Sequence, residues 1–324
     1  MPAKHGREQM PLKGKGFDRM DDEVTYTASM DGKIEMQNDR IVVLPVHEVS
    51  GNAELAEGNI DFRGDIVIHG NVESGVNIRA TGSITIDGVA EACMLEAGKD
   101  IILRGGMLGG NKASVKTKGA ITAKFFEFTN ILCEGDLQAD VLMDCSVICH
   151  GQIRLTGRKG SIIGGKVQAI RGLIATSLGN DAEKRTEIFV GAGIDVYSRL
   201  RVMEKKIETT REELAKIEEG LEKFEILSKE RGVSYTNDPR RTSLLRIKIK
   251  DSAMLASDEE EVRKLRILAE SSRGACVSVI QEIYPGVIIN MDELKLALKN
   301  MATGVEFYKL PDKIGTRPCS AGVE

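Results

Sequence analysis

Aromatic side chains are scarce in this sequence. It has no tryptophan, and aromatic residues make up 4% of its 324 positions, while glycine occurs 34 times. Large globular cores draw much of their buried surface from aromatic residues. A chain that is poor in them and rich in glycine is better suited to thin, stacked coils. The contents of 41% apolar and 29% charged residues are otherwise those of an ordinary folded protein.

Long apolar runs and an excess of basic residues are also missing. No stretch approaches the roughly 18 consecutive apolar residues that a membrane helix needs. The formal net charge is −4, so no global positive field points to nucleic acid or anionic lipid as a partner. The first residues lack the apolar segment of a signal peptide. We therefore expect a cytoplasmic protein without a membrane span and without a nucleic-acid partner.

The cysteines do not have the spacing of a zinc site. Six are present: Cys93, Cys133, Cys145, Cys149, Cys276 and Cys319. Cys145, Cys149 and His150 lie close in sequence, and a metal site there is the less favoured alternative. Cys133 and Cys149 take the same place in the repeat described next, which predicts that they stack one coil apart, at about 4.8 Å. A reducing cytosol favours two buried thiols over a disulfide.

A nine-residue template recurs between residues 59 and 193. It consists of apolar, any, small, any, glycine or basic, any, apolar, any and apolar residues, and its first copies are 60–68 and 78–86. Its central position recurs every 16 to 21 residues, at Gly64, Gly82, Lys99, Gly119, Gly135, Gly151, Arg171 and, loosely, Ala192. A unit of this length is too short for a helix pair and suits one coil of a parallel β-solenoid.

The template also predicts which side chains face the core. In the second copy the alternating residues Ile78, Ala80, Ile84 and Ile86 share one face and are expected to be buried. A central glycine indicates a corner with unusual backbone angles or a close approach between chain segments. The glycine-rich basic segment 157–166 lacks the Walker spacing of a phosphate loop. We interpret it as a tight corner with an exposed basic patch, with nucleotide binding as the alternative.

Near residue 197 the apolar period changes to seven. Two interleaved series carry it, Leu200, Ile207, Leu214 and Leu221, and Met203, Thr210, Ile217 and Phe224. A second helical stretch, about 239–272, is less regular and carries Leu244, Leu245, Ile247, Met254, Leu255, Val262, Leu265 and Leu268. Gly232 and a turn at 237–239 separate the two stretches, which predicts an antiparallel coiled-coil hairpin. An intermolecular coiled coil is the alternative.

Alternating strand patterns return at 276–280, 283–289 and 305–308, with a short helix as one interpretation of 291–300. Strands are also expected at 24–28, 33–36 and 41–44, with turns at 31–32 and 38–39. The chain is thus predicted to be mainly β, a parallel β-helix with an inserted antiparallel helical coiled coil. Its expected parts are a flexible N-terminal arm (1–23), capping strands and β-helix (24–195), the coiled-coil insertion (196–273), C-terminal strands that rejoin the β-helix (274–310) and a flexible tail (311–324).

Several motifs are jointly similar to one bacterial family. They are Gly-Asn-Ile-Asp-Phe at 58–62, Gly-Asp-Ile-Val-Ile at 64–68, Ala-Lys-Phe at 123–125, Gly-Ser-Ile-Ile-Gly-Gly-Lys-Val at 160–167 and Tyr-Pro-Gly-Val at 284–287. On these motifs the chain resembles, over about 26–308, the flagellar assembly protein A family, long labelled a domain of unknown function. The resemblance implies a right-handed β-helix interrupted by a coiled coil. It implies no established catalytic residues, and roles in flagellar assembly or polar organisation through protein contacts. The α/β domain with which members usually begin is expected to be absent or truncated here.

We therefore predict a non-enzymatic scaffold that binds protein partners, through the coiled coil in particular, with homo-oligomerisation as a further alternative. No catalytic, cofactor-binding or metal-ligating set can be assembled from the sequence. A polymer-forming, bactofilin-like solenoid is the first alternative function.

A solenoid enzyme is the second alternative. Hexapeptide acyltransferases have a strict six-residue repeat, but here the six-residue step holds only for Ile66, Val72, Ile78 and Ile84. His69 and His150 are the only histidines in the repeats, and each lies beside a glycine corner. A polysaccharide lyase would use carboxylates in a groove, and the candidates near corners are Asp65, Asp87, Asp100 and Asp136. Aspartate beside glycine is more often a turn residue.

Overall fold

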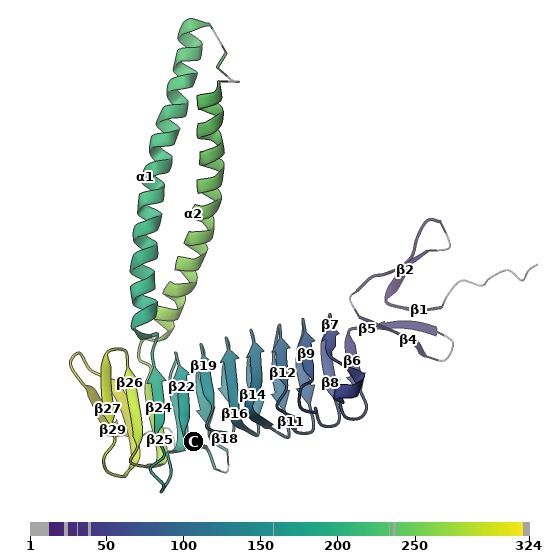
Figure 1. Ribbon diagram of the computed structural model, residues 1–324, viewed down its shortest axis with the longest axis vertical. Helices are drawn as coiled ribbons and strands as arrows, with labels where there is room; N and C mark the ends of the chain where they lie inside the picture. Colours follow the sequence, from purple (N-terminus) through teal and green to yellow (C-terminus); the bar gives the residue numbers. More distant parts are fainter. Residues whose placement is uncertain are drawn as a thin grey trace, which may run out of the picture.

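The molecule is a rod of stacked strands from which two long helices project near one end (Figure 1). The computed structural model describes residues 13–22, 25–30, 32–37, 40–157, 159–232, 234–235 and 238–319. The rod is a β-solenoid of about 8 turns, and nearly all of its strand pairs are parallel. Within the described residues, neither helix has a segment apolar enough to cross a membrane.

Each coil contributes to three parallel ladders. The first ladder contains β7 (Ile60–Phe62), β9 (Asn77–Ala80), β12 (Met94–Ala97), β14 (Met107–Thr117), β16 (Phe125–Cys133), β19 (Ser146–Cys149), β22 (Gly165–Ala169), β24 (Thr186–Val190) and β26 (Val287–Met291). The second contains β6 (Val46–Val49), β8 (Asp65–Ile68), β10 (Ile84–Ile86), β13 (Ile101–Leu103), β15 (Ile121–Ala123), β17 (Leu137–Gln138), β20 (Ile153–Leu155), β23 (Leu173–Leu178) and β25 (Cys276–Ile283).

A third ladder closes each coil. It contains β11 (Ala90–Glu91), β18 (Val141–Met143) and β21 (Ser161–Ile163), together with the first parts of β14 and β16 and the last parts of β23 and β25. The nine-residue template covers only the first two ladders and the corner between them. The third was missed because the chain between template copies varies in length. The register shift between Leu108 and Ala113 in β14 is one such variation.

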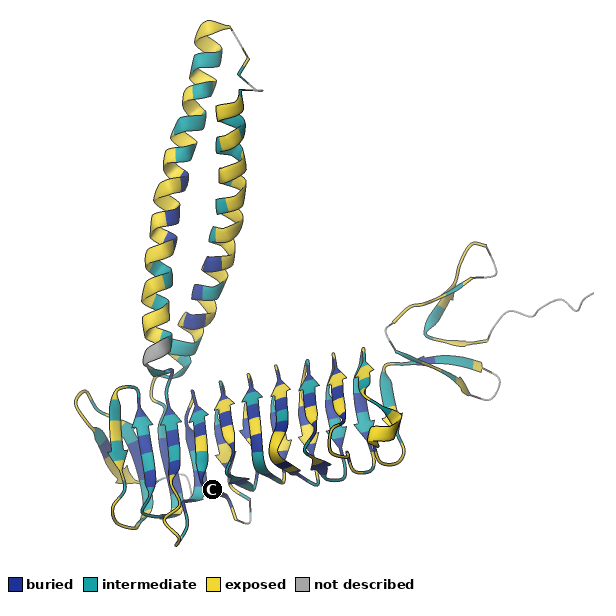
Figure 2. Cartoon of the chain, viewed as in Figure 1, coloured by how far each residue is buried: buried dark blue, intermediate teal, exposed yellow. Residues whose placement is uncertain are grey.

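The register of the strands places like residues in columns through the rod. In the second ladder Ile66, Ile84, Ile101, Ile121, Leu137, Ile153, Leu173 and Val277 lie in one column. Every residue of this column is essentially inaccessible to solvent. Figure 2 shows the same alternation of buried and exposed positions along the strands. The predicted inward residues Ile78, Ala80, Ile84 and Ile86 are all buried, which confirms the assigned face.

At the N-terminal end the strands before residue 45 do not join the solenoid ladders. β5 (Arg40–Leu44) pairs with β1 (Gly14–Lys15) and β4 (Lys33–Gln37), and β2 (Phe17–Arg19) pairs with β3 (Tyr26–Ala28). β1 and β2 fall in the segment expected to be a flexible arm, so that expectation is wrong for 14–19. The expected turn at 38–39 lies outside the described residues. The first coil holds the short 3₁₀ helix η1 (Leu55–Glu57).

At the other end three antiparallel strands cover the last coil. β27 (Leu294–Ala297) pairs with β26, β28 (Ala302–Lys309) pairs with β25, and β29 (Ile314–Pro318) pairs with β28. The short helix considered for 291–300 is therefore wrong, because the backbone there completes a sheet. The unstructured tail is also wrong for Ile314–Pro318, where pairing with β28 orders the chain.

The two helices interrupt one coil at a corner. β24 ends at Val190 in the first ladder, α1 (Gly193–Arg231) and α2 (Pro239–Ser271) follow, and β25 then enters the second ladder. Gly232 ends α1, as predicted, and takes a left-handed conformation there. The Asp238 carboxylate caps α2 by accepting a 2.8 Å hydrogen bond from the Arg240 backbone amide. The insertion therefore replaces a corner and leaves the ladders continuous.

The helices pack side by side and antiparallel. Ile207, Thr210 and Leu214 of α1 are buried, as the seven-residue series predicts. On α2 the buried positions are Asp258, Val262 and Leu265. Ile247 and Met254, two apolar residues in the second predicted stretch, are 43% and 40% exposed. They lie at the side of the contact between the helices.

Candidate interaction surfaces of the solenoid and the helical hairpin

The corner between the first and second ladders is the most regular surface of the rod. Its glycines are required because neighbouring coils approach closely there. A Cβ atom on Gly135 would lie 2.6 Å from the carbonyl oxygen of Gly119 in the preceding coil. Of the two reasons offered by the sequence, close approach is the one that holds at Gly135, while Gly64 in the first coil also has a positive φ angle.

Carboxylates at this corner have a structural role. The side chains of Asp65, Asp100 and Asp136 each accept a hydrogen bond of 2.7–2.8 Å from a backbone amide in the next coil. These oxygens satisfy amides that the turning backbone leaves outside the ladders. The aspartates considered for a polysaccharide lyase are therefore corner caps at three of the four positions.

The fourth aspartate belongs to a surface column with one of the two histidines. His69 Nδ1 lies 2.9 Å from Asp87 Oδ2, and Arg104 Nη1 lies 3.4 Å from Asp87 Oδ1. The three side chains come from successive coils, and His69 is 47% exposed. Such an exposed column of polar contacts fits a role in holding coils in register.

His150 lines a cleft between the corner column and the root of α2. The cleft has a volume of about 620 Å³, and its solenoid wall includes Glu134 and an ion pair in which Arg171 Nη2 lies 2.6 Å from Asp136 Oδ1. The exposed Ile267 lies on the helical wall. The two histidines lie on separate surfaces and are not brought into one site.

The stacked cysteines lie in the core. Cys133 and Cys149 are direct neighbours in the first ladder and are fully buried. Their thiols donate to the carbonyl oxygens of Gly119 and Gly135 at 3.3 and 3.2 Å. Thr117 is one coil earlier and donates in the same way to the carbonyl of Lys99. All six cysteines are free, and no group of three metal-ligating side chains occurs among the described residues.

The glycine-rich segment 157–166 leads into strands. Gly160, Gly164 and Gly165 have positive φ angles, and β21 and β22 follow or overlap the segment. The Lys166 ammonium lies 4.6 Å from the centre of the Phe189 ring in the next coil. A strand rather than a helix N-terminus follows the glycines, so the geometry is that of a corner and not of a phosphate-binding loop.

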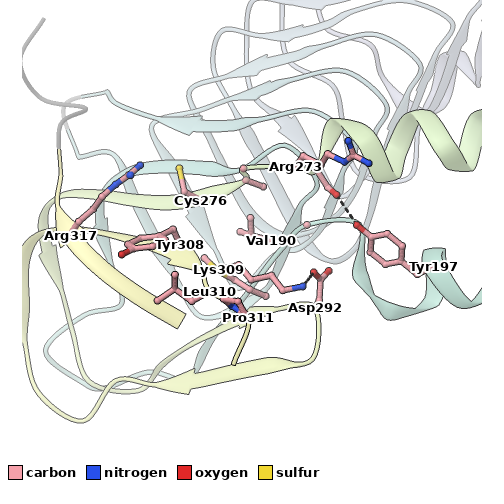
Figure 3. Close-up of a pocket in the computed structure, with 15 residues that line it drawn as sticks. Val190, Tyr197, Arg273, Cys276, Asp292, Tyr308, Lys309, Leu310, Pro311 and Arg317 are labelled. Carbon is pink, nitrogen blue, oxygen red and sulfur yellow. Dashed lines mark hydrogen bonds and ion pairs between the residues drawn. The ribbon is translucent and has the colours of Figure 1, made fainter. Parts of the chain in front are cut away.

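A hollow of about 570 Å³ lies where the hairpin meets the C-terminal strands. Figure 3 shows Lys309 and Asp292 pointing toward one another, with Nζ 2.6 Å from Oδ2. The Tyr197 hydroxyl lies 3.3 Å from the Ser272 hydroxyl and connects the roots of α1 and α2. Burial raises the pKa of the Cys276 thiol, which keeps it protonated and weakly nucleophilic at neutral pH.

The opposite wall of this hollow belongs to the C-terminal strands. The Arg317 guanidinium pairs with the buried Glu306 carboxylate and lies 5.1 Å from the centre of the Tyr308 ring. The charged side chains of the C-terminal wall are therefore paired within the protein. The hollow brings the hairpin root beside the end of the rod, and sequence reasoning missed it because lining residues such as Tyr197 and Lys309 lie more than a hundred positions apart.

Ion pairs join the two helices along the hairpin. They are Arg199–Glu261, Glu204–Arg266, Lys206–Asp258, Arg211–Glu259 and Glu218–Lys248. The side chains are largely exposed except for the buried Asp258. The hairpin is thus held by a narrow buried seam with charged edges.

Comparison with known proteins supports one family. A search of curated proteins gave no match, and a search of solved structures gave none. A family model described as the Flagellar Assembly Protein A beta solenoid domain matches residues 45–314, which include the solenoid, the helical insertion and the returning strands. This match covers most of the chain and agrees with the resemblance found from short motifs. The chain therefore belongs to the flagellar assembly protein A family of β-solenoid proteins.

Proposed function

We propose that this protein is a non-enzymatic scaffold that acts through protein contacts in flagellar assembly or polar organisation. The family match supports the flagellar context. The use of Asp65, Asp100 and Asp136 as corner caps supports a structural role for carboxylates that an enzyme would need. A cytoplasmic location and right-handed winding of the solenoid are part of the proposal.

The observation that carries this proposal is the placement of the hairpin. It is inserted at a single corner, and the strand columns on either side continue as if it were absent. Its seven-residue seam and its charged edges support its description as an intramolecular coiled coil. A projecting element on which the solenoid core does not depend is well placed to bind partners, while the rod fixes the distance between bound partners.

Deletion of the hairpin tests the proposal. Residues 193–274 would be replaced by a short glycine-containing turn, and recovery of crosslinked partners from flagellated cells would be compared with that of the full chain. We expect partner recovery to fall at least about tenfold, as expected when the central contacts of an interface are removed. The thermal transition of the rod should persist. Unchanged recovery with a folded rod would contradict the hairpin as the docking element.

A polymer-forming solenoid is the second candidate. At the N-terminal end, β6 and β7 each have one edge without a strand partner among the described residues, which favours end-to-end addition there. The antiparallel strands β27, β28 and β29 alter the geometry of the other end. Filaments in electron micrographs of concentrated protein would favour this alternative over a discrete scaffold. Turnover of acyl-CoA or acidic polysaccharide would instead favour an enzyme.

A further inference from the structure

The two sides of the helical hairpin differ. On one side, which we call the paired flank, ion pairs continue from the root toward the tip. They are Glu204–Arg266, Arg211–Glu259 and Glu218–Lys248. On the other side, the ion pairs among the described residues are confined to the half nearest the rod. They are Arg199–Glu261 and Lys206–Asp258.

The second side becomes apolar toward the tip. Steps of seven residues return to nearly the same side of a helix. From Arg199 on α1 these steps pass Lys206 and Glu213 and reach Gly220 and Leu227, and from Glu261 on α2 they lead back to Met254 and Ile247. We call these four distal residues, Gly220, Leu227, Ile247 and Met254, the open flank.

The open flank is a partly exposed apolar surface along the line where the two helices meet, and we refer to it as the groove. Ile247 and Met254 are 43% and 40% exposed. Gly220 has no side chain, and a Cβ placed there would meet only Leu244 Cδ1, at 3.4 Å. A helix that packs against one other helix needs apolar residues at only two positions of each heptad. An apolar residue at a third position is typical of helices in bundles of more than two helices. The groove therefore matches the apolar stripe of one further helix.

Lysines surround this groove. Lys223 lies three residues beyond Gly220, Lys216 four before it, and Lys250 three beyond Ile247, so each is a neighbour of the open flank on its helix. All three are exposed. Within the part of the chain that the structure describes, none of them forms an ion pair, in contrast to the lysine and arginines of the paired flank. The exposed Glu213 and Glu230 lie on the same side of α1 and only partly offset the three lysines, so the rim carries a net positive charge.

We propose that the open flank binds an amphipathic helix of a partner protein whose apolar stripe is bordered by aspartate and glutamate. Helices recognise such grooves through apolar residues spaced by three and four, and complementary charges set their orientation. The proposal rests on the hairpin's role as a docking element and names its surface and the chemistry of its partner.

A second copy of the hairpin fits this surface less well. Glu218 and Lys248 form an ion pair and are therefore level with each other. Lys216 lies two residues before Glu218 and Lys250 two residues after Lys248, so these two lysines are also level with each other. A parallel two-fold pairing of open flanks would bring Lys216 of one copy opposite Lys250 of the other. Like charges face each other in that arrangement, whereas an acidic helix neutralises both.

Probe peptides test the proposal on the full chain. One labelled helical peptide of about three heptads carries leucine at its apolar positions and glutamate beside them, and a second carries lysine in place of glutamate. Fluorescence anisotropy should show that only the acidic peptide binds, and more weakly as salt is raised. We expect I247D to weaken this binding about tenfold or more. The triple variant K216E/K223E/K250E should transfer the preference to the basic peptide.

Matched controls lie on other faces of the same helices. Ile249 is 71% exposed and lies outside the open flank, so I249D should bind the acidic peptide like the parent chain. K229E should likewise leave binding unchanged.

Equal losses in I247D and I249D, or no loss in I247D with helicity retained, would overturn the proposal. So would a dimer in light scattering that I247D abolishes, because a second copy would then cover the groove. Loss of partners on hairpin deletion without any effect of I247D would leave the scaffold function standing and remove this surface.

Discussion

The solenoid and the helical hairpin are stabilised in different ways. In the rod, every coil contributes buried apolar columns and backbone hydrogen bonds to both neighbours. The hairpin is one pair of helices with a thin seam and largely exposed ion pairs. Because neighbouring coils are in close contact, the rod tolerates few substitutions at its corners. Substitutions on the exposed surface of the hairpin should lower stability only slightly. The rod therefore suits a fixed support and the hairpin a variable contact element.

Glycine substitutions should separate the two regions most strongly. In G135V the added side chain would clash with the backbone of the preceding coil, since even its Cβ would lie 2.6 Å from the Gly119 oxygen. We expect a loss of about 3 kcal/mol in the free energy of unfolding. In G220A the new methyl fits and helix propensity improves, so the hairpin should gain about 1 kcal/mol. Urea unfolding followed by circular dichroism checks both, and a well-tolerated G135V would refute close packing at the corner.

Alkaline pH should weaken the rod more than the hairpin, which has no cysteine. Burial raises the pKa of the Cys93 thiol to about 12 and that of Cys145 to about 11. In the unfolded chain these thiols ionise near pH 8.5. Their contribution to stability is therefore complete below that pH and is lost as pH rises toward 11 or 12. By pH 10.5 the free energy of unfolding should fall by about 3 kcal/mol per thiol.

The double variant C93A/C145A provides the control for this pH dependence. Its stability should fall less steeply between pH 8 and 10.5 than that of the parent chain, although its stability at pH 8 is lower because two small cavities remain. Urea unfolding at both pH values gives the two slopes. Equal slopes would show that these thiols do not carry the effect.

Ion pairs of the hairpin should have the smallest effect. Glu204 and Arg266 approach to 2.6 Å, but their side chains are 39% and 60% exposed. A double-mutant cycle with E204Q and R266Q should give a coupling of about 0.5 kcal/mol, and less at high salt. Hydrogen exchange of the hairpin amides measures it. A coupling above about 2 kcal/mol would indicate that the edges, rather than the seam, hold the helices together.

Much of the rod could be predicted because its repeat acts through nearest neighbours. Residues such as Ile84 and Ile101 are apolar and occupy the same inward position in successive coils. Their spacing by one repeat is enough to predict that they stack, without knowledge of the rest of the chain. The stacked pair Cys133 and Cys149 was found by the same reasoning. The third ladder has no constant length between copies, and for that reason it left no period to detect.

The hairpin surfaces were harder to predict. The seven-residue series identified the seam of α1, but Ile247 and Met254 could be assigned to the open flank only after α2 was seen to turn Asp258, Val262 and Leu265 toward α1. The hollow at the hairpin root depends on residues such as Tyr197 and Lys309, which the chain brings together only after the last coil is complete.

The sequence alone determined the coil, its inward residues, the site of the helical insertion and the family, because each depends on local periodicity or on short motifs. Tertiary structure decided three features: how many ladders close a coil, which carboxylates are used as corner caps, and on which side of the hairpin the ion pairs of the described residues stop short of the tip. These depend on contacts between segments that are distant in sequence, such as the antiparallel α1 and α2. Periodicity gives the direction in which a side chain points, and only the assembled fold gives what it meets there.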